Sequence, residues 1–315
     1  MNNTWPTGVF STRLIQNLSD QGAISAGRPY DADQIQPASL DLRLGETAFR
    51  VRSSFLPGPG KTVTERIETL KLHQIDLTKG AVLERGCVYI VPLLESLDLP
   101  ETVSASANPK SSTGRLDIFT RVISDAARSF DIVPAGYKGA LYLEISPRTF
   151  PVLVRTGSRL SQMRFRVGDA RLDAAGHKAL HAEQTLVFDP NMDVGEGVSL
   201  SIDLIGEGRS GLIGFRSKRH TAVVDVDKKN ALDVLDYWEP LVNRGSGELI
   251  LDPDEFYILV SRESVHVPPD YAAEMVPFDP LVGEFRVHYA GFFDPGFGHS
   301  AAGGTGSRAV LEVRS

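Results

Sequence analysis

The sequence predicts a mainly β protein, an antiparallel sandwich or barrel, that contains two tandem copies of one module. Short apolar runs that alternate with polar residues recur along most of the 315-residue chain, as expected of strands with one buried face. The 29 Gly and 19 Pro residues are spread between these runs, where they favour turns. Matching residues also recur at a constant offset of 168 positions, and such self-similarity indicates a duplication.

The first predicted element is a helix in STRLIQNL, because Leu14, Ile15 and Leu18 recur at helical spacing and Gly22 can end it. Strands dominate after this helix. ASLDLRLG and GALYLEIS alternate apolar and polar residues, CVYIVPL is almost continuously apolar, and FPVLVRTGSRLSQMRFRV predicts two strands around a glycine turn. These strand-forming segments span residues 38–45, 139–146, 87–93 and 150–167.

The repeat predicts where one module ends and the next begins. Tyr89, Glu95, Ser96 and Pro100 of the first half are matched by Tyr257, Glu263, Ser264 and Pro268 of the second. Between the halves, FDPNMDVGEG (188–197) has the Pro, Gly and acidic residues of a linker. We therefore expect a first module over residues 1–190 and a second, degenerate module over 197–315.

Composition excludes several classes of function. The net charge of −7 argues against broad charge-driven binding to nucleic acid or to an anionic membrane, although a local cationic pocket is compatible with it. The single Cys87 excludes an internal disulfide and a cysteine-rich zinc site. The N-terminal residues lack the pattern of a secretory signal, and no apolar run approaches 18 residues. We expect a cytoplasmic protein.

The segment PKSSTGR (109–115) is a candidate phosphate-binding loop. Lys110 and Arg115 offer charge and several N–H donors, Ser111 and Ser112 offer hydroxyls, and Gly114 permits a backbone that exposes its amides. Together these groups predict a site for the oxygens of an oligophosphate. The alternative is an ordinary polar loop, since turns use the same residue types.

Glu144 is the candidate catalytic carboxylate. It lies in GALYLEIS, where Tyr142 and Glu144 share one face of the predicted strand and Leu141 and Leu143 the other. A carboxylate shielded from water beside a phosphate-binding loop can act as a general base. The alternative is a charge on a solvated outer face of the sheet.

Four blocks in this order resemble the dCTP deaminase family of the dUTPase-like superfamily, in the duplicated long form found in some bacteria. They are IQPASLDLRLG (35–45), PKSSTGRL (109–116), AGYKGALYLEIS (135–146) and GSRLSQMRF (157–165). The resemblance implies a distorted antiparallel β-barrel of the dUTPase-like β-clip type, present twice. It also implies a homo-oligomer, a trimer with sites between subunits, and hydrolysis of Mg²⁺-bound dCTP to dUTP and ammonia without zinc. dTTP is a further nucleotide that the family binds.

The resemblance also implies roles for individual residues. Glu144 matches the catalytic carboxylate, which takes a proton from the water that adds to cytosine C4, and Ser111 and Arg115 match residues that position this water. Backbone groups of Val122 to Ser124 would contact the cytosine edge, and Tyr142 and Leu143 would flank the base. The substrate-binding residues implied in this way are Lys110, Ser111, Ser112, Thr113, Gly114, Arg115, Val122, Ile123, Ser124, Tyr142, Leu143 and Gln162.

The chain also departs from the family pattern. Pro134 stands where the family has an Asp beside the sugar, and Asp125 or Asp131 is either its substitute or an ordinary loop residue. In the second module PFDPLVGE (277–284) replaces the phosphate-binding loop, although Glu312 matches Glu144. Two rivals to a dCTP deaminase are a dUTP diphosphatase, alone or combined with deamination, and a nucleotide-binding regulator without turnover. Loss of the family Asp favours deamination, because dUTPases of this fold use that residue to activate water.

Overall fold

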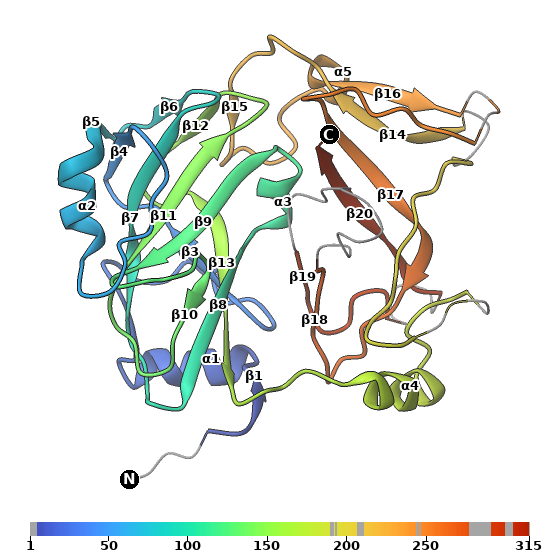
Figure 1. Cartoon of the computed structure of the whole chain (residues 1–315), viewed down its shortest axis with the longest axis horizontal. Helices are drawn as coiled ribbons and strands as arrows, with labels where there is room; N and C mark the ends of the chain where they lie inside the picture. Colours follow the sequence, from blue (N-terminus) through green and yellow to red (C-terminus); the bar gives the residue numbers. More distant parts are fainter. Residues whose placement is uncertain are drawn as a thin grey trace. The chain divides into compact units, whose positions relative to one another are not determined.

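The structure is a computed structural model that describes residues 5–189, 192, 194–206, 211–243, 245, 247–276, 291–299 and 305–314. These residues form a mainly β protein with mostly antiparallel sheets and a few short helices (Figure 1). The chain divides into two compact units. Unit 1 comprises residues 1–170 and 222–231, and unit 2 comprises residues 171–221 and 232–315.

The larger sheet of unit 1 carries the candidate carboxylate. Its strands follow the order β5-β4-β7-β11-β9, and β2 also pairs with β7. All pairings in this sheet are antiparallel. The strands are β2 (Ile24–Ala26), β4 (Thr47–Val51), β5 (Lys71–Asp76), β7 (Val88–Asp98), β9 (Ile118–Ser124) and β11 (Lys138–Pro147).

A second sheet of unit 1 carries the segment before the phosphate-binding loop. Its strands follow the order β1-β13-β8-β10, with β3 paired to β13, and a third sheet has the order β15-β12-β6. The two strands predicted around Gly157 form, but β12 and β13 pair in different sheets. The strands are β1 (Gly8–Val9), β3 (Leu40–Arg43), β6 (Ala81–Leu83), β8 (Val103–Pro109), β10 (Ile132–Val133), β12 (Val152–Val154), β13 (Arg159–Val167) and β15 (Val224–Asp225).

The alternating leucines of β3 predicted a strand with one exposed face, but the structure shows no exposed face on this strand. All four of its residues are buried, and the polar ones have charged partners. Asp41 forms an ion pair with Lys110, and Arg43 forms one with Glu95, with 2.8 Å between Nε and Oε1. The polar residues of β3 therefore face side chains of opposite charge instead of water.

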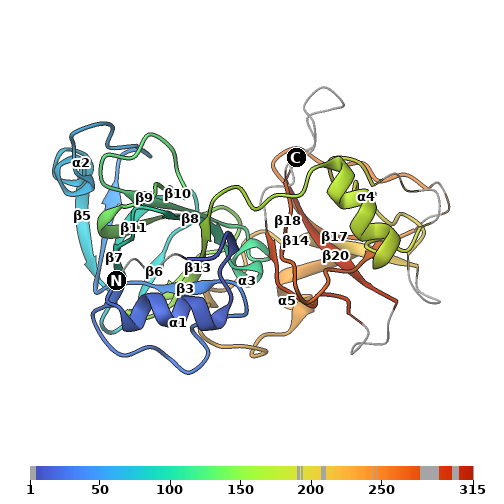
Figure 2. The ribbon, with the colours of Figure 1, turned by 90° about the horizontal axis from the view of Figure 1, so that it is seen from below.

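The described residues of unit 1 form three helices, and the first was predicted. α1 (Thr12–Asp20) buries Ile15 and Leu18, and Gly22 follows it with φ +79° while its N–H donates to the Ser19 carbonyl. α2 (Val63–Leu70) was not predicted, although Thr62 and Glu65 form a capping box at its start. α1 and α2 lie on different sides of unit 1 in both views (Figure 2). The third helix is the short α3 (Ser111–Gly114).

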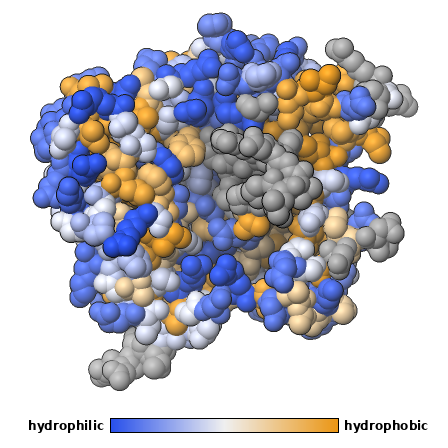
Figure 3. Space-filling model, in the orientation of Figure 1, coloured by the Kyte–Doolittle hydropathy of each residue, from blue (hydrophilic) through white to orange (hydrophobic). Residues whose placement is uncertain are grey.

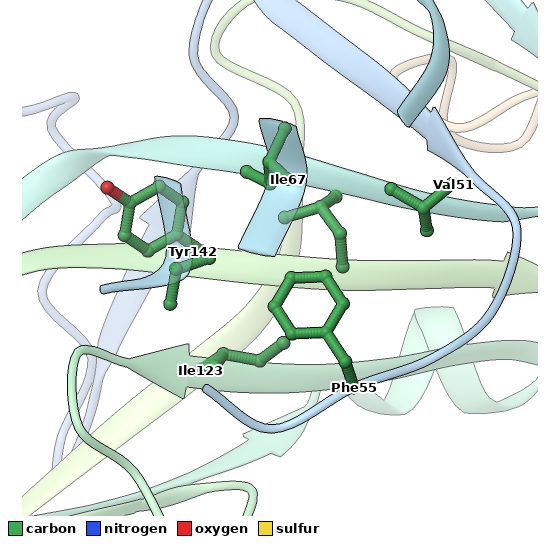
Figure 4. Close-up of a cluster of buried hydrophobic side chains, with 7 residues drawn as sticks. Val51, Phe55, Ile67, Ile123 and Tyr142 are labelled. Atoms are coloured by element: carbon green, nitrogen blue, oxygen red, sulfur yellow. The ribbon is translucent and has the colours of Figure 1, made fainter. Parts of the chain in front are cut away.

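A compact apolar cluster covers the face of the larger sheet on which Glu144 lies. Figure 4 shows Phe55 and Ile67 packed over Ile123 of β9 and Tyr142 of β11, with Val51 of β4 at one side. Tyr142 and Ile123 are direct cross-strand partners. Burial of these side chains stabilises the contact between α2, the segment before it and the sheet.

Unit 2 contains a four-stranded antiparallel sheet in the order β16-β14-β17-β20 and the pair β18–β19. Tyr257, Leu259, Leu311 and Val313 form a buried cluster on β17 and β20. The elements are α4 (Ala174–Glu183), β14 (Leu212–Ser217), α5 (Val234–Tyr237), β16 (Trp238–Val242), β17 (Phe256–Val265), β18 (Ala273–Glu274), β19 (Phe292–Phe293) and β20 (Ser307–Arg314). The segment PFDPLVGE lies outside the described residues.

Contacts in unit 2 recur at the offset found in the sequence. The Tyr89 hydroxyl accepts a hydrogen bond from the Glu84 N–H at 3.0 Å, and the Tyr257 hydroxyl accepts one from Asp252 at 2.8 Å. Both members of the second pair lie 168 positions after the first. Glu144 stands opposite Ile90 across its sheet, and Glu312 stands opposite Ile258.

The surface mixes hydrophilic and hydrophobic residues (Figure 3). In unit 2 several apolar side chains are exposed on α5 and β16, including Val234, Leu235 and Val242. Among the described residues, no helix has the length and apolar character that a membrane span requires.

Candidate active site

The predicted phosphate-binding loop forms the single helical turn α3 between β8 and β9. The carbonyl of Lys110 accepts hydrogen bonds from the N–H groups of Thr113 and Gly114, at 2.8 and 3.0 Å. Both residues are buried. The N–H groups of Thr113 and Gly114 are therefore used inside the turn.

The remaining polar residues of the turn face solvent. Ser111, Ser112 and Arg115 are exposed, so two hydroxyls and a guanidinium are accessible within five consecutive positions. Hydroxyl and guanidinium groups are suitable donors to phosphate oxygens. Of the residues predicted in this loop, these three lie where a phosphate can reach them without displacing the backbone.

Lys110 is paired with a buried carboxylate. Its Nζ contacts Oδ2 of Asp41, and Arg159 Nη1 lies 3.4 Å from the same oxygen. Asp41 is buried, and burial raises its pKa while the Lys110 and Arg159 charges act in the opposite direction. Asp41 thus holds two cations beside α3, a cluster that sequence reasoning did not identify.

Gln162 lies on β13 next to this cluster. Its Oε1 accepts a hydrogen bond from the Ser39 hydroxyl at 3.0 Å, and its Nε2 donates to the Pro109 carbonyl at 3.4 Å. Its cross-strand neighbours are Asp41 on one side and Asn108 on the other. Gln162 therefore connects β3 with the end of β8, directly before the phosphate-binding loop.

Glu144 is buried, with 1% of its surface exposed, so the alternative of a solvated outer face is wrong. It stands opposite Arg121 across the β9–β11 pair. Arg121 donates to its Oε1 from Nη2 at 2.7 Å and from Nε at 3.1 Å. Within the described residues Oε2 is buried and has no hydrogen-bond partner. Glu144 is therefore a shielded carboxylate with one oxygen held and the other unpaired.

Tyr142 and Leu143 lie on opposite faces of β11, as their alternation predicted. Leu143 is fully buried. Tyr142 belongs to the apolar cluster of Figure 4, where its hydroxyl points away from the other labelled side chains. This hydroxyl lies 3.0 Å from the Thr64 hydroxyl. Of these two residues, Tyr142 is the one that shares the face of Glu144. Ile123, the cross-strand partner of Tyr142, lies on the same face.

The backbone of Val122 is already engaged. Its N–H donates to Asp131 Oδ1 at 2.7 Å, and its carbonyl accepts from the Asp131 N–H at 2.9 Å. The Ser124 carbonyl accepts from Ala127 at 3.3 Å. The N–H and carbonyl of Val122 were expected to contact the cytosine edge. In this conformation both are hydrogen-bonded to Asp131 instead.

Asp131 is held in an unusual position beside the carboxylate. Its φ is +63°, a left-handed conformation that Asp tolerates better than most residues. Burial raises the pKa of Asp131 to about 7, the Val122 hydrogen bond and Arg121 lower it, and Glu144 raises it. Asp125 has a different environment, because its Oδ1 accepts from the Val63 N–H at the start of α2.

The carboxylate and the phosphate-binding loop are not connected by side-chain hydrogen bonds in the described part of the chain. Glu144 pairs with Arg121, and within the described residues neither Ser111 nor Arg115 donates a hydrogen bond to it. The described residues also contain no group of three or more His, Cys, Asp or Glu side chains arranged to hold a metal ion.

Two family models match almost the whole chain. Residues 6–169 match the N-terminal domain of 2′-deoxycytidine 5′-triphosphate deaminase, and residues 173–315 match its C-terminal domain. Together with the ordered blocks of the first half, these matches cover both units.

Relatives and a solved structure agree with the family models. A protein of Coprothermobacter proteolyticus named "dCTP deaminase, dUMP-forming" is 31% identical over 160 residues, which is 50% of this chain and 81% of the relative. A "dCTP deaminase" of Halorubrum lacusprofundi is 31% identical over 138 residues, 43% of this chain and 65% of the relative. The crystal structure of 2′-deoxycytidine 5′-triphosphate deaminase from Agrobacterium tumefaciens is 67% identical, with a TM-score of 0.95 over 98% of this chain and 93% of that one. This chain belongs to the dCTP deaminase family.

Proposed function

We propose that this chain hydrolyses Mg²⁺-bound dCTP to dUTP and ammonia, with Glu144 as the general base and acid. The observation that carries the proposal is the environment of Glu144, a carboxylate shielded from solvent that keeps one oxygen unpaired among the described residues. A shielded and oriented carboxylate is well suited to accept a proton from water.

The proposed reaction balances within the site. Glu144 Oε2 takes a proton from water as the oxygen of that water bonds to cytosine C4, and Glu144 delivers this proton to N3. Glu144 then takes the proton of the new C4 hydroxyl and passes it to the exocyclic amine, so that the C4–N bond breaks, ammonia leaves and C4 carries the carbonyl of uracil. One water is consumed, and Glu144 is regenerated as a carboxylate.

The phosphate-binding loop supplies the other half of the proposed site. Ser111, Ser112 and Arg115 bind the triphosphate oxygens, supported by the fact that all three are exposed on one turn. Because no side-chain hydrogen bond connects this loop to Glu144 among the described residues, we propose that a complete site combines two subunits of a trimer. Lys110 and Gln162 support the loop through Asp41 and Pro109.

We further propose that the two units are copies of one dUTPase-like β-barrel module in a cytoplasmic enzyme. The support is the matching strand order, β5-β4-β7-β11 in unit 1 and β16-β14-β17-β20 in unit 2, together with the constant offset of 168. The first module is catalytic, and the second, which lacks the serines and cations of PKSSTGR, serves packing.

A second candidate function is the combined activity that forms dUMP. Its support is that several relatives, including those of Coprothermobacter proteolyticus and Beutenbergia cavernae, are named dUMP-forming. Against it, Pro134 stands where the family resemblance places an Asp that activates water for the second hydrolysis. A nucleotide-binding regulator without turnover is less well supported, because Glu144 and the loop residues are all present.

The test is to incubate the protein with dCTP and Mg²⁺ and to measure ammonia, dUTP, dUMP and pyrophosphate separately. We expect ammonia and dUTP, and dUMP with pyrophosphate would establish the combined activity instead. Glu144→Gln should lower turnover by at least about 10²-fold while dCTP still binds. Glu312→Gln, the matched change 168 positions later, should leave turnover unchanged. Normal turnover by Glu144→Gln would refute the proposed base.

A further inference from the structure

Arg121 makes an asymmetric contact with Glu144. Both of its donors, Nη2 at 2.7 Å and Nε at 3.1 Å, bind the same oxygen, Oε1. A guanidinium facing a free carboxylate more often uses both oxygens in a bidentate pair. Here the contact fixes the carboxylate while Oε2 is left without a partner among the described residues.

Arg121 is itself held from three directions. Its Nη2 also donates to the Ser54 hydroxyl at 2.8 Å. The guanidinium carbon lies 3.5 Å from the centroid of the Phe130 ring and 4.7 Å from that of Phe119. Such contacts stabilise a cation over an aromatic face and restrict its rotamers. The guanidinium is therefore fixed independently of Glu144 and can orient it.

The charges around this pair are few and identifiable. Across β9 and β11 the carboxylate of Glu144 faces Arg121, and Asp131 approaches from the segment after β9. Arg121 acts to lower the pKa of Asp131, and Glu144 acts to raise it. Arg121 is thus the cation that both carboxyl groups share, and its loss would leave two acidic groups together in a shielded place.

We infer that Arg121 is a positioning residue for the deamination, which fixes Glu144 through Oε1 so that Oε2 faces the attacking water. The inference rests on the proposed role of Glu144. It assigns to Arg121 no contact with the nucleotide, because Nε and Nη2 bind Glu144 and Ser54 and the guanidinium lies against the Phe130 ring. Removing Arg121 should therefore slow the chemical step and leave substrate binding almost unchanged.

The test compares Arg121→Leu and Arg121→Lys with the parent enzyme, with kcat and KM measured for dCTP. We expect Arg121→Leu to lower kcat by about 10²-fold, as a misplaced catalytic group does, with KM within about twofold. Arg121→Lys, which offers a single donor to Oε1, should recover part of kcat.

Two further variants keep the test decisive if Arg121→Leu folds poorly. Ser54→Ala removes one of the contacts that fix Arg121, and we expect a several-fold lower kcat at unchanged KM. Arg85→Leu is the matched control, because Arg85 is an exposed arginine of the same unit whose Nε donates to the Arg148 carbonyl. Its kinetics should equal those of the parent enzyme.

The outcomes separate this inference from the proposed function. Full activity of Glu144→Gln would refute the base assignment and the inference with it. An inactive Glu144→Gln variant combined with unchanged kcat in Arg121→Leu would refute the inference alone. A loss of thermal stability in Arg121→Leu with KM raised well beyond twofold and no recovery of kcat in Arg121→Lys would also overturn it, since a merely structural role predicts that result.

Discussion

Glu95→Gln is expected to destabilise unit 1 strongly, because it removes the carboxylate that is in contact with the fully buried guanidinium of Arg43. Arg43 and Glu95 are each about 1% exposed. Glu95 Oε1 accepts from Arg43 Nε and from Gln34 Nε2, and Oε2 accepts from the Arg43 N–H, each at 2.8 Å. The other guanidinium donors bind the carbonyls of Pro29 and Arg28, which carry no net charge.

The magnitude follows from this geometry. Glutamine keeps one acceptor oxygen but turns an NH₂ group toward a donor, so at least one of the three hydrogen bonds is lost. It also leaves the buried guanidinium without neutralisation, since Asp31 is exposed and lies 4.0 Å from Nη1. Breaking a buried ion pair from one side costs about 3–5 kcal/mol. In a domain of 150–250 residues this lowers Tm by about 6–20 °C.

Urea and thermal unfolding followed by circular dichroism and fluorescence will measure this loss, with Trp5 reporting on unit 1 and Trp238 on unit 2. Glu263→Gln is the matched control. Glu263 occupies the equivalent position 168 residues later and accepts hydrogen bonds from the N–H and hydroxyl of Ser201, so its loss should cost only about 1.5 kcal/mol. Equal losses in the two variants would refute the reasoning from the buried arginine.

Two further predictions test the site and the packing of unit 1. Asp131→Asn should keep the left-handed backbone and the Val122 hydrogen bond. Because the pKa of Asp131 is raised from 3.8 to about 7 in the folded protein, the parent loses stability as pH rises from about 4 to 7, and the variant does not. The gain in free energy of unfolding of the variant over the parent, measured by urea unfolding, should be negligible near pH 4 and at most about 4 kcal/mol above pH 7. Partial exposure of Asp131 to water reduces this upper value. A gain that does not vary with pH would contradict the raised pKa of Asp131. Gly45→Ala should lower the free energy of unfolding by about 1–3 kcal/mol in the same assay, because a Cβ would lie 2.5 Å from the Pro92 carbonyl oxygen. Gly27→Ala is the control and should be tolerated, because the nearest atom to its Cβ would be 3.7 Å away. Equal stabilities of these two variants would show that the backbone relaxes around Gly45.

Strand alternation predicted which residues share a face, and in β11 it placed Tyr142 and Glu144 together. It failed for β3, because alternation cannot distinguish a solvated polar residue from a buried polar residue that pairs with an opposite charge. The charged partners of Asp41 and Arg43 are Lys110 and Glu95, which lie 69 and 52 positions away in the sequence. No local pattern reports such pairs.

The fate of residues 222–231 was equally invisible to sequence reasoning. They follow the expected linker by more than 20 positions, yet β15 pairs with β12, and Asp225 forms an ion pair with Arg155 at 2.7 Å. A two-residue strand has too little pattern to be recognised without its neighbour. Its contacts with β12 and Arg155 place this segment in unit 1.

The sequence by itself determined the mainly β class, the repeat at 168 positions, the polar segment that contains Ser111, Ser112 and Arg115, and the strand that bears Glu144. These features depend on residue type and spacing, which a linear chain records. Only the tertiary structure decided that Arg121 binds one oxygen of Glu144 and that Asp131 forms hydrogen bonds with the backbone of Val122. Those contacts depend on strand register and on one left-handed residue, and both are fixed only when distant segments pack together.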